Sequence, residues 1–436
     1  MNHVFQSFSF ACVVYFTRSS VDERQRHRGI GVTPARAASI ITVNSTLDNI
    51  TIDGACTLRE AIINANADLD TTGGDCIAGS GNDTIIFDSS LGTGTITLTS
   101  MLPVITDDAG LTIDGDNRIT LNGDDSVRVL YVGSAGMLTL QNIIITHGSA
   151  TQGGGLNSEG TVTITHSTFS NNSATNGSGG GVANVGGTAT ITNSAFSNNS
   201  ATGDGGGVFN DGTLTIANSA FSNNSATAGG GVLNNNGIAT ILNSTFSGNS
   251  ATNNGGGVTN SAGTLTIANS AFSNNSANFG GGVINNSGTA TILNSTFSGN
   301  SATAVGGGVA TYKGDTVPTT TIRNTILANS GAGEDCWNHA TGTLSGGNNI
   351  IETTSTCASI ASLTSDPNLG SLAGSPAYFP LNAGSPAIDA GDDAVCAAAP
   401  VSNTSQNGLT RPQGMHCDIG SVEALRFLIY LPLVMR

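Results

Sequence analysis

The richest charged patch of the central chain lies between residues 114 and 128. It consists of four aspartates and two arginines, Asp114, Asp116, Asp124, Asp125, Arg118 and Arg128. Two suitably separated carboxylates can cleave a glycosidic bond, and a bound cation can stabilise the charge that develops in β-elimination. Aspartates in Gly- and Asn-rich turns more often accept hydrogen bonds from nearby backbone amides. We favour this second interpretation, with a polysaccharide site or a calcium site as the alternative.

A second group of ionisable residues lies near the C-terminus, and the sequence does not show whether they converge. The group comprises Asp366, Asp389, Asp392, Asp393, Arg411, His416, Asp418 and Glu423. Between the two groups, residues 148–312 carry three formal charges: Glu159, Asp204 and Asp211. Their one histidine, His166, occupies a position that is Asn in later repeats. Because acid–base chemistry needs placed ionisable groups, any catalytic site is expected before or after this segment.

The middle of the chain is an internal repeat with a period of about 25 residues. One register holds a phenylalanine, at Phe169, Phe196, Phe221, Phe246, Phe272 and Phe297. A second register holds an aliphatic residue after three glycines, at Leu156, Val182, Val208, Val232, Val258, Val283 and Val309. Each repeat contains three short stretches with alternating apolar positions, such as TLTIANS, AFSNNSA and GGGVFN. This alternation is typical of strands.

Three short strands per repeat, joined by Gly, Asn and Ser turns, describe one coil of a solenoid. We predict an all-β fold, a right-handed single-stranded parallel β-helix that resembles the solenoid of pectate lyases, with a short N-terminal capping helix. A single coil buries too little apolar surface to offset its backbone entropy, so stacking has to supply the rest. The phenylalanines are expected to form a column in the core.

Asparagines recur in three registers of the repeat. The leading one is Asn193, Asn218, Asn243, Asn269 and Asn294. The second is Asn184, Asn210, Asn234, Asn260 and Asn285, and the third is Asn199, Asn224, Asn249, Asn275 and Asn300. Stacked amides can bond to the coils above and below, and Asn tolerates the left-handed conformation. We expect structural ladders, with ligand binding as the alternative.

The stretch GACTLREAIINANAD, residues 54–68, gives the one good helix signal. Thr57 and Glu60 have capping-box spacing. The apolar face consists of Leu58, Ala61, Ile62 and Ala65. We predict a lid over the first coil, in which Arg59 and Glu60 form an exposed pair rather than a catalytic one.

Six of the seven cysteines fall into three local pairs, Cys56 with Cys76, Cys336 with Cys357, and Cys396 with Cys417. Loops of this size closed by disulfides would each contribute about 3 kcal/mol. The alternative is free thiols, and the sequence alone does not fix the connectivity. Paired cysteines favour an oxidising, extracytoplasmic location. Residues 1–37, which include Cys12, form a leader-like segment, so we expect secretion.

Acidic residues outnumber basic ones by 29 to 13, which gives a formal net charge of −16. Binding to nucleic acid or to an anionic membrane needs a basic face, so we exclude both. No run of 18 apolar residues exists, and no spanning helix is expected. GSGNDTIIF at residues 79–87 is similar to one calcium-binding nonapeptide, but such sites need several stacked copies. We therefore expect no cofactor, with calcium as the one alternative.

Several motifs resemble known families. GGGV followed by F-S-x-N, over residues ~150–310, resembles the repeats of chlamydial polymorphic outer-membrane proteins. Their surface-exposed β-helices act in adhesion. CTLREA at 56–61 resembles the CSLREA domain of secreted bacterial β-helix proteins. SDPNLGSL, YFPLNAGSPAIDAGD and RPQGMHCDIGSVEA together resemble the choice-of-anchor Q domain of secreted and surface bacterial proteins.

These resemblances divide the chain into five segments and imply an extracellular or cell-surface location on a bacterium. A leader at 1–37 precedes a CSLREA-like cap at 38–94 and a parallel β-helix at 95–324, whose regular coils span 150–312. A choice-of-anchor Q-like region at 325–424 and an apolar tail at 425–436 follow.

The function that we favour is a non-catalytic, structural or adhesive β-helix that presents an extended polar face to glycans, cells or matrix. A polysaccharide lyase or glycoside hydrolase is the alternative. A third hypothesis comes from outward threonine pairs, whose T-x-T arrays resemble those of β-helical ice-binding proteins. These pairs are Thr161/Thr163, Thr188/Thr190, Thr213/Thr215, Thr264/Thr266 and Thr289/Thr291.

Overall fold

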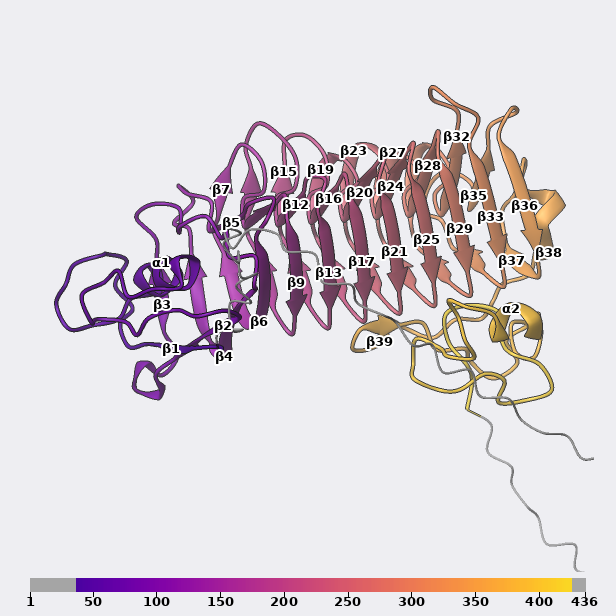
Figure 1. Cartoon of the computed structure of the whole chain (residues 1–436). Helices are drawn as coiled ribbons and strands as arrows, with labels where there is room; N and C mark the ends of the chain where they lie inside the picture. Colours follow the sequence, from indigo (N-terminus) through magenta and orange to yellow (C-terminus); the bar gives the residue numbers. More distant parts are fainter. Residues whose placement is uncertain (1–36, 426–436) are drawn as a thin grey trace, which may run out of the picture. The chain divides into compact units, whose positions relative to one another are not determined.

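Each sequence repeat closes one coil of a parallel β-helix, and the predicted fold class is confirmed (Figure 1). The computed structural model describes residues 37–425. Strands of successive coils pair in parallel, and three long sheets run along the stack. The solenoid is right-handed and contains few helices.

The first sheet receives two strands from each regular coil. Its longer strands are β1 (Ile40–Val43), β2 (Asp83–Phe87), β4 (Leu111–Asn122), β6 (Met137–Thr146), β9 (Thr161–Thr165), β13 (Thr188–Thr192), β17 (Thr213–Ala217), β21 (Ile238–Leu242), β25 (Thr264–Ala268), β29 (Thr289–Leu293), β33 (Thr319–Arg323) and β36 (Thr343–Gly347). Its shorter strands are β3 (Thr95–Thr97), β10 (Thr168–Ser170), β14 (Ala195–Ser197), β18 (Ala220–Ser222), β22 (Thr245–Ser247), β26 (Ala271–Ser273), β30 (Thr296–Ser298), β34 (Ile326–Ala328), β37 (Asn349–Ile351) and β38 (Ala361–Leu363).

The other two sheets receive one strand per coil. One contains β5 (Leu130–Val132), β8 (Leu156–Ser158), β12 (Val182–Asn184), β16 (Val208–Asn210), β20 (Val232–Asn235), β24 (Val258–Ser261), β28 (Val283–Asn286), β32 (Val309–Tyr312) and β35 (Cys336–Asn338). The other contains β7 (Ser149–Ala150), β11 (Ser173–Ala174), β15 (Ser200–Ala201), β19 (Ser225–Ala228), β23 (Ser250–Asn254), β27 (Ser276–Phe279) and β31 (Ser301–Val305).

A left-handed residue, His166 in the first regular coil and Asn in the later ones, separates the two strands that each coil gives to the first sheet, which corrects the expectation of three strands per coil. In the coil that contains β17 this residue is Asn218, with φ of 50°. The hydroxyl of the buried Ser219 donates to the Ala217 carbonyl at 2.8 Å and accepts the Ser194 amide of the preceding coil at 3.2 Å. The same bond connects a column of serines, Ser167, Ser194, Ser219, Ser244, Ser270 and Ser295. These hydroxyls stabilise the bend from coil to coil.

The six repeat phenylalanines form the predicted column in the core. Phe169, Phe196, Phe221, Phe246, Phe272 and Phe297 are fully buried. Neighbouring ring centroids lie between 4.4 and 5.0 Å apart, and the rings are within 9° of parallel. The spacing follows from the distance of about 4.8 Å between paired strands.

Amide-to-amide hydrogen bonds run through the second and third asparagine registers. Bonds of 2.9 to 3.0 Å join Asn172, Asn199, Asn224, Asn249, Asn275 and Asn300. Bonds of 2.7 to 2.9 Å join Asn184, Asn210, Asn234, Asn260 and Asn285. These side chains are at most 1 % exposed, and a buried amide has to be satisfied inside the protein.

The leading register, Asn193 to Asn294, has the expected left-handed backbone but forms no such ladder, which corrects the prediction. Asn193 and Asn218 are exposed. The side-chain oxygens of Asn243, Asn269 and Asn294 have no hydrogen-bond partner within residues 37–425. The physical reason is that these side chains lie at an outward bend, where nothing forces neighbouring amides to pair.

Helix α1 (Leu58–Ala67) forms where the capping box predicted it, with its apolar face buried. The expectation of an exposed Arg59–Glu60 pair is wrong. Glu60 is 1 % exposed because it accepts the Thr57 amide in the capping box. Arg59 binds the largely buried Asp48 at 2.8 Å and the Met101 carbonyl at 2.8 Å. Both residues therefore hold the cap together.

The β-helix extends beyond the expected 95–324 range at both ends. β1 pairs with β2, and β2 pairs with β4, before the regular coils. After residue 324, β34 pairs with β37 and β37 pairs with β38. The glycine triplets stop there, but Cys336 and Ile351 still occupy core positions. Buried apolar residues are therefore sufficient to continue the strands without the glycine triplets.

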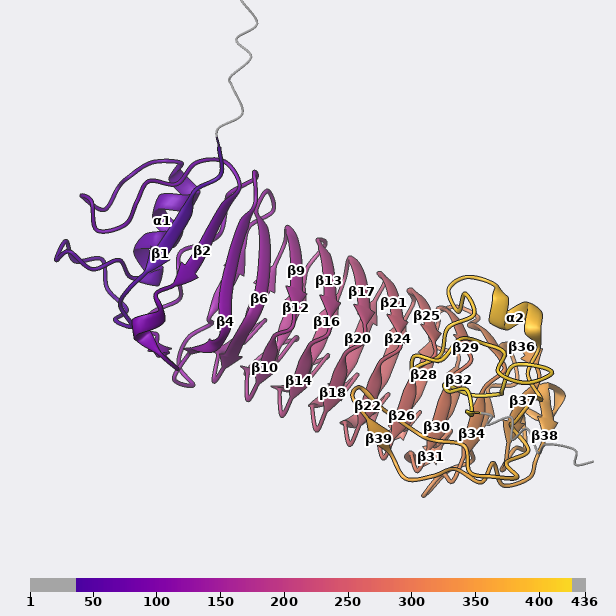
Figure 2. The ribbon, with the colours of Figure 1, turned by 90° about the horizontal axis from the view of Figure 1, so that it is seen from below.

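The C-terminal region turns back along the stack, and Figure 2 shows it beside β22 to β34. It contains a 3₁₀ turn, η2 (Ala358–Ile360), a short hairpin of β39 (Ala373–Gly374) and β40 (Ala377–Tyr378), and α2 (Asp393–Ala397). A second 3₁₀ turn, η1 (Ser89–Leu91), lies near the N-terminal cap. The Gln406 amide donates to the Thr245 hydroxyl at 3.0 Å, and the Ser421 amide donates to that of Thr296 at 2.9 Å.

Disulfides join the cysteines in three local pairs, Cys56–Cys76, Cys336–Cys357 and Cys396–Cys417. The first closes the loop after α1, and the third lies in the C-terminal region. No helix within residues 37–425 is long and apolar enough to cross a membrane. The leader, with Cys12, and residues 426–436 of the tail lie outside the described residues.

Candidate functional site

The charged patch at residues 114–128 is held by internal bonds rather than arranged around a cavity. Asp114 accepts hydrogen bonds from Gln141 at 2.8 Å and from Asn142 at 3.0 Å. Burial opposes ionisation, but the bonds from Asn142, the Asp116 amide and Gln141 outweigh it and lower the Asp114 pKa. An ionised carboxylate that already accepts several protein donors is a poor general acid.

Arg118 is also engaged, whereas Asp124 and Asp125 are exposed. Arg118 binds Asp116 at 2.9 Å and the Gly92 carbonyl at 2.7 Å. Asp124 and Asp125 have left-handed backbones in a turn.

Arg128 lies apart from these acids. It donates to the Gln152 carbonyl at 2.7 Å and lies 5.4 Å from the centre of the Tyr131 ring. The Tyr131 hydroxyl donates to Glu159 at 2.5 Å, and this bond is the main reason that its pKa is raised. The favoured interpretation as turn acids agrees with these contacts.

Three of the C-terminal candidates converge, but they do so inside the protein. Arg411 and Glu423 form an ion pair of 3.1 Å, and both side chains are fully buried. Burial lowers the Arg411 pKa to about 10. Burial also raises the pKa values of Glu423 and of Asp418, whose oxygens accept the Asp389 and Ala424 amides. This cluster stabilises the C-terminal region and offers no route to a substrate.

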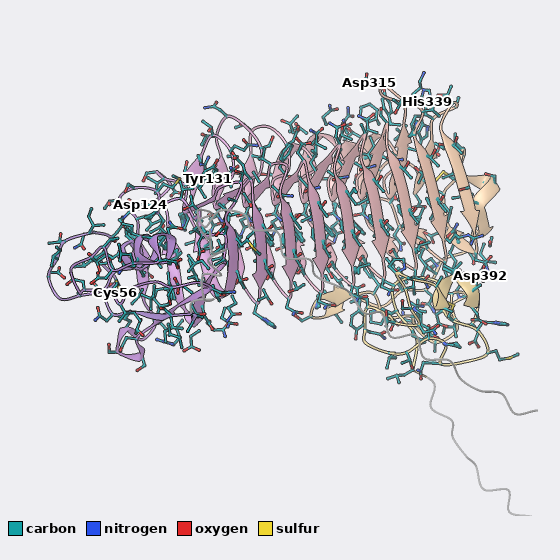
Figure 3. The ribbon with its side chains drawn as sticks, in the orientation of Figure 1. Cys56, Asp124, Tyr131, Asp315, His339 and Asp392 are labelled. Atoms are coloured by element: carbon teal, nitrogen blue, oxygen red, sulfur yellow. A yellow bond between two sulfur atoms is a disulfide. The ribbon has the colours of Figure 1, made fainter. Side chains whose placement is uncertain are left out.

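The other C-terminal candidates have local partners. Asp392 caps α2, and the Asp366 side chain accepts the Asn368 amide at 2.7 Å. The one exposed pair is Asp393 with His416, at 2.8 Å, and the hydrogen bond from His416 is the main cause of the lowered Asp393 pKa. Figure 3 shows Asp124 and Asp392 at widely separated places, so the two charged groups do not meet in one site.

No group of three or more His, Cys, Asp or Glu side chains within residues 37–425 is arranged to hold a metal ion. In the nonapeptide-like stretch, Asp83 is fully buried in β2 and accepts the amides of Ser39 and Ser80 at 3.0 and 2.9 Å. Burial raises its pKa. Its oxygens are thus committed to the fold.

A hollow lies along the leading asparagine register, on the outward bend of the first sheet. Its volume is about 450 Å³. It is lined by Asn117, His166, Ser167, Thr168, Asn193, Ser194, Ala195, Asn218, Ala220, Ser375 and Pro376. We call it the bend groove. The solenoid supplies its floor, and the turn between β39 and β40 supplies Ser375 and Pro376 at its edge.

The lining of the bend groove is polar and almost uncharged. Amides and hydroxyls dominate it, and His166 is its one titratable side chain. The His166 Nδ1 atom lies 3.0 Å from the Thr165 hydroxyl. The groove therefore suits hydrogen bonding to a neutral polar ligand and lacks the pair of groups that acid–base catalysis needs.

The bend groove ends where the C-terminal region covers the same register. Asn269 donates to the Thr404 hydroxyl at 3.3 Å, and Asn294 donates to the Cys396 sulfur at 3.1 Å. Asn324 donates to the Asp392 carbonyl at 3.1 Å and accepts the Asp392 amide at 2.9 Å. Sequence reasoning identified this register but not the cover. The residue type at the position after the bend gives no signal, because Thr245 and Thr296 bond to the cover whereas Thr168 lines the open groove.

Comparisons with known proteins gave a short family match and a distant structural likeness. The family model described as the Chlamydia polymorphic membrane protein repeat matches residues 193–211. This segment contains part of the groove floor, but it is too short to assign the whole chain to that family. A comparison with curated proteins gave no match. Among solved structures, the crystal structure of pectate lyase Pel9A is similar, with a TM-score of 0.48 and 14% identity over 88% of this chain and 96% of that chain.

Proposed function

We propose that this chain is a secreted or cell-surface β-helix protein that acts by binding, and that the bend groove takes a neutral glycan. The observation that carries the proposal is the contrast between the groove and the charged candidates. The groove offers open amides and hydroxyls, whereas Asp114 and the Arg411–Glu423 pair are held by protein partners and the exposed Asp116 is paired with Arg118.

The chemistry of the groove fits a sugar better than a charged ligand. Sugar hydroxyls both donate and accept hydrogen bonds, as do the Asn193 and Asn218 amides and the Thr168 hydroxyl. A polyanion would find no cation to pair with, and the chain carries a formal net charge of −16. Cells or matrix would then be recognised through their glycans.

The location is consistent with this role. Disulfides persist in oxidising compartments, and the matched repeat model describes a membrane protein repeat. Attachment to the surface of a bacterium, through segments similar to the CSLREA and choice-of-anchor Q domains, is part of the proposal.

A glycan-array screen of residues 38–424 tests the binding role. The groove variant is Ala195→Lys with Ala220→Lys, which places two long side chains in the groove. The matched control is Thr190→Lys with Thr215→Lys, which makes the same change in the same coils on the neighbouring strands. We expect the groove variant to lose binding at least tenfold while the control keeps it. Equal loss in both, or no binding to any glycan by the parent protein, would refute the groove assignment.

The enzymatic alternative needs its own assay. We expect no uronide or glycan cleavage on a broad polysaccharide panel, with or without added calcium. Robust turnover that disappears in Asp114→Asn with Asp116→Asn would overturn the binding role, since these acids would then be catalytic.

A second candidate function rests on the outward threonines of the first sheet. One column is unbroken and stacks in register through Thr163, Thr190, Thr215, Thr240, Thr266, Thr291 and Thr321. The column beside it is interrupted by Ile238. Thermal hysteresis measurements test ice binding. The variant Thr190→Lys with Thr215→Lys should abolish the hysteresis, whereas the groove variant should retain it.

A further inference from the structure

Four aromatic rings gather at the surface, outside the core column. They belong to Phe279 at the end of β27, Tyr312 at the end of β32, Trp337 in β35, and His339 just after β35. The Tyr312 ring lies 5.4 Å from Phe279, 6.1 Å from Trp337 and 6.0 Å from His339, between ring centroids. Trp337 and His339 lie 5.9 Å apart. We call this group the aromatic cluster.

The strand register brings these rings together. β32 pairs with β35, so that Ala310 lies opposite Trp337 and Thr311 lies opposite Asn338. Cys336 is buried in the core, and the side chain of the next residue therefore points outward. Tyr312 is 36 % exposed, and Figure 3 shows Asp315 and His339 together at one edge of the structure.

The polar ends of the rings have no acceptor within the described chain. The structure shows no hydrogen bond from the Tyr312 hydroxyl or the Trp337 indole nitrogen to any of residues 37–425. The Thr341 amide donates to His339 Nδ1 at 3.3 Å, so the neutral imidazole carries its proton on Nε2. Tyr and Trp groups of this kind are enriched in binding surfaces, where an apolar ring and a polar tip are used together.

We propose that the aromatic cluster is a binding site for a neutral pyranose glycan, separate from the bend groove. The apolar C–H face of a pyranose can lie against the ring faces, while its hydroxyls accept from Tyr312, Trp337 and His339. Rigid aromatic side chains lose little conformational entropy when they bind. The choice of a glycan as ligand class rests on the proposed function, whereas the site itself rests on the ring geometry.

The charges around the cluster favour a neutral ligand. Lys313 follows Tyr312 directly, Asp315 lies two residues further on, and both are exposed. Their opposite charges leave no local excess for a charged sugar to pair with. Nucleobases also stack on aromatic rings, but a nucleic acid would have to approach an acidic protein.

Intrinsic fluorescence tests the proposal directly, because Trp337 is the only tryptophan in the chain. The probes are neutral hexasaccharides of glucose, xylose and mannose, with hexagalacturonate as the charged comparison. We expect a saturable change in Trp337 emission with at least one neutral probe and none with hexagalacturonate. Absence of a saturable change with every neutral probe, or a stronger response to hexagalacturonate, would overturn the proposal.

Variants separate binding from a merely structural role of the rings. Tyr312→Ala should weaken binding at least tenfold with little change in the melting temperature, since the ring lies at the surface. The matched control is Phe209→Ala, which removes a half-buried outward ring of the same sheet far from the cluster. Equal weakening in both would contradict the site.

The groove variant keeps the two proposals distinguishable. The double variant Ala195→Lys with Ala220→Lys should leave the fluorescence titration of Trp337 with oligosaccharides unchanged, even if the variant no longer binds to the glycan array. If the parent protein binds no glycan on the array but its Trp337 titration saturates, the groove assignment is wrong and the aromatic site stands. The opposite pattern refutes the aromatic site alone.

Discussion

Residues 212–226 and 263–277 have the identical sequence GTLTIANSAFSNNSA, yet they differ in what surrounds them. Asn218 and its neighbours in the first copy line the open bend groove, whereas Asn269 in the second copy is 2 % exposed under the C-terminal region. Ala220 is half-buried, and its counterpart Ala271 is fully buried. The sequence of the coil therefore does not determine which part of the repeat face is open to a ligand. The C-terminal region that lies over part of this face, which we call the cover, determines it.

The largest expected effect follows from loosening the cover. Arg411→Met leaves Glu423 without its cation in a fully buried position. Removing one partner of such a pair costs about 3–5 kcal/mol. We expect the C-terminal region to open locally, with a large rise in hydrogen exchange at residues 403–423 and little change in the coils of residues 150–230.

The control for this change is Arg118→Met, which breaks an ion pair with the exposed Asp116. Such pairs contribute about 0–1 kcal/mol, so its exchange pattern should match that of the parent protein. If Arg411→Met leaves exchange in the C-terminal region unchanged, the buried cluster does not hold the cover in place.

A smaller effect is expected from the same substitution at the twin positions. Glycine suits the left-handed backbone at both Asn218 and Asn269. Asn269→Gly removes the bond to Thr404, which should cost about 1 kcal/mol in chemical denaturation, whereas Asn218→Gly should cost close to nothing. Equal losses of unfolding free energy in the two variants would mean that the contact between the cover and Asn269 does not stabilise the protein.

The smallest effect concerns Asp204, a half-buried acid within the repeats. Burial raises its pKa, so the stability that it contributes is present below the unfolded pKa of about 3.9 and is lost as the pH rises through the folded value. Asp204→Asn should therefore raise the melting temperature at pH 7 by less than about 2 °C. The gain should vanish near pH 3.5. A gain that is larger at acid pH than at pH 7 would contradict this sign.

The fold could be predicted from the sequence because one coil is encoded many times. The phenylalanine column, the strand alternation and the α1 capping box each depend on residues close together in the chain or at a fixed period. The two buried asparagine ladders were predictable for the same reason, although the leading register was not the one that pairs.

The site was harder to predict because it depends on contacts between distant residues. Thr245 bonds to Gln406, and Asn324 bonds to Asp392, across separations that no repeat pattern reports. The aromatic cluster is similar, since Phe279, Tyr312 and Trp337 meet only through the coil register. The burial of Glu60 was missed, although the capping box that holds its carboxylate was predicted.

The most direct test of the covered and open copies is thiol labelling at the twin alanines. Ala220→Cys and Ala271→Cys place the same thiol in the same local sequence, and each is compared with the parent protein under native conditions. We expect Ala220→Cys to react at a rate close to that of an exposed thiol and Ala271→Cys to react at least a hundredfold more slowly. Equal rates at the two positions would contradict the claim that the cover decides which part of the repeat face is open to a ligand.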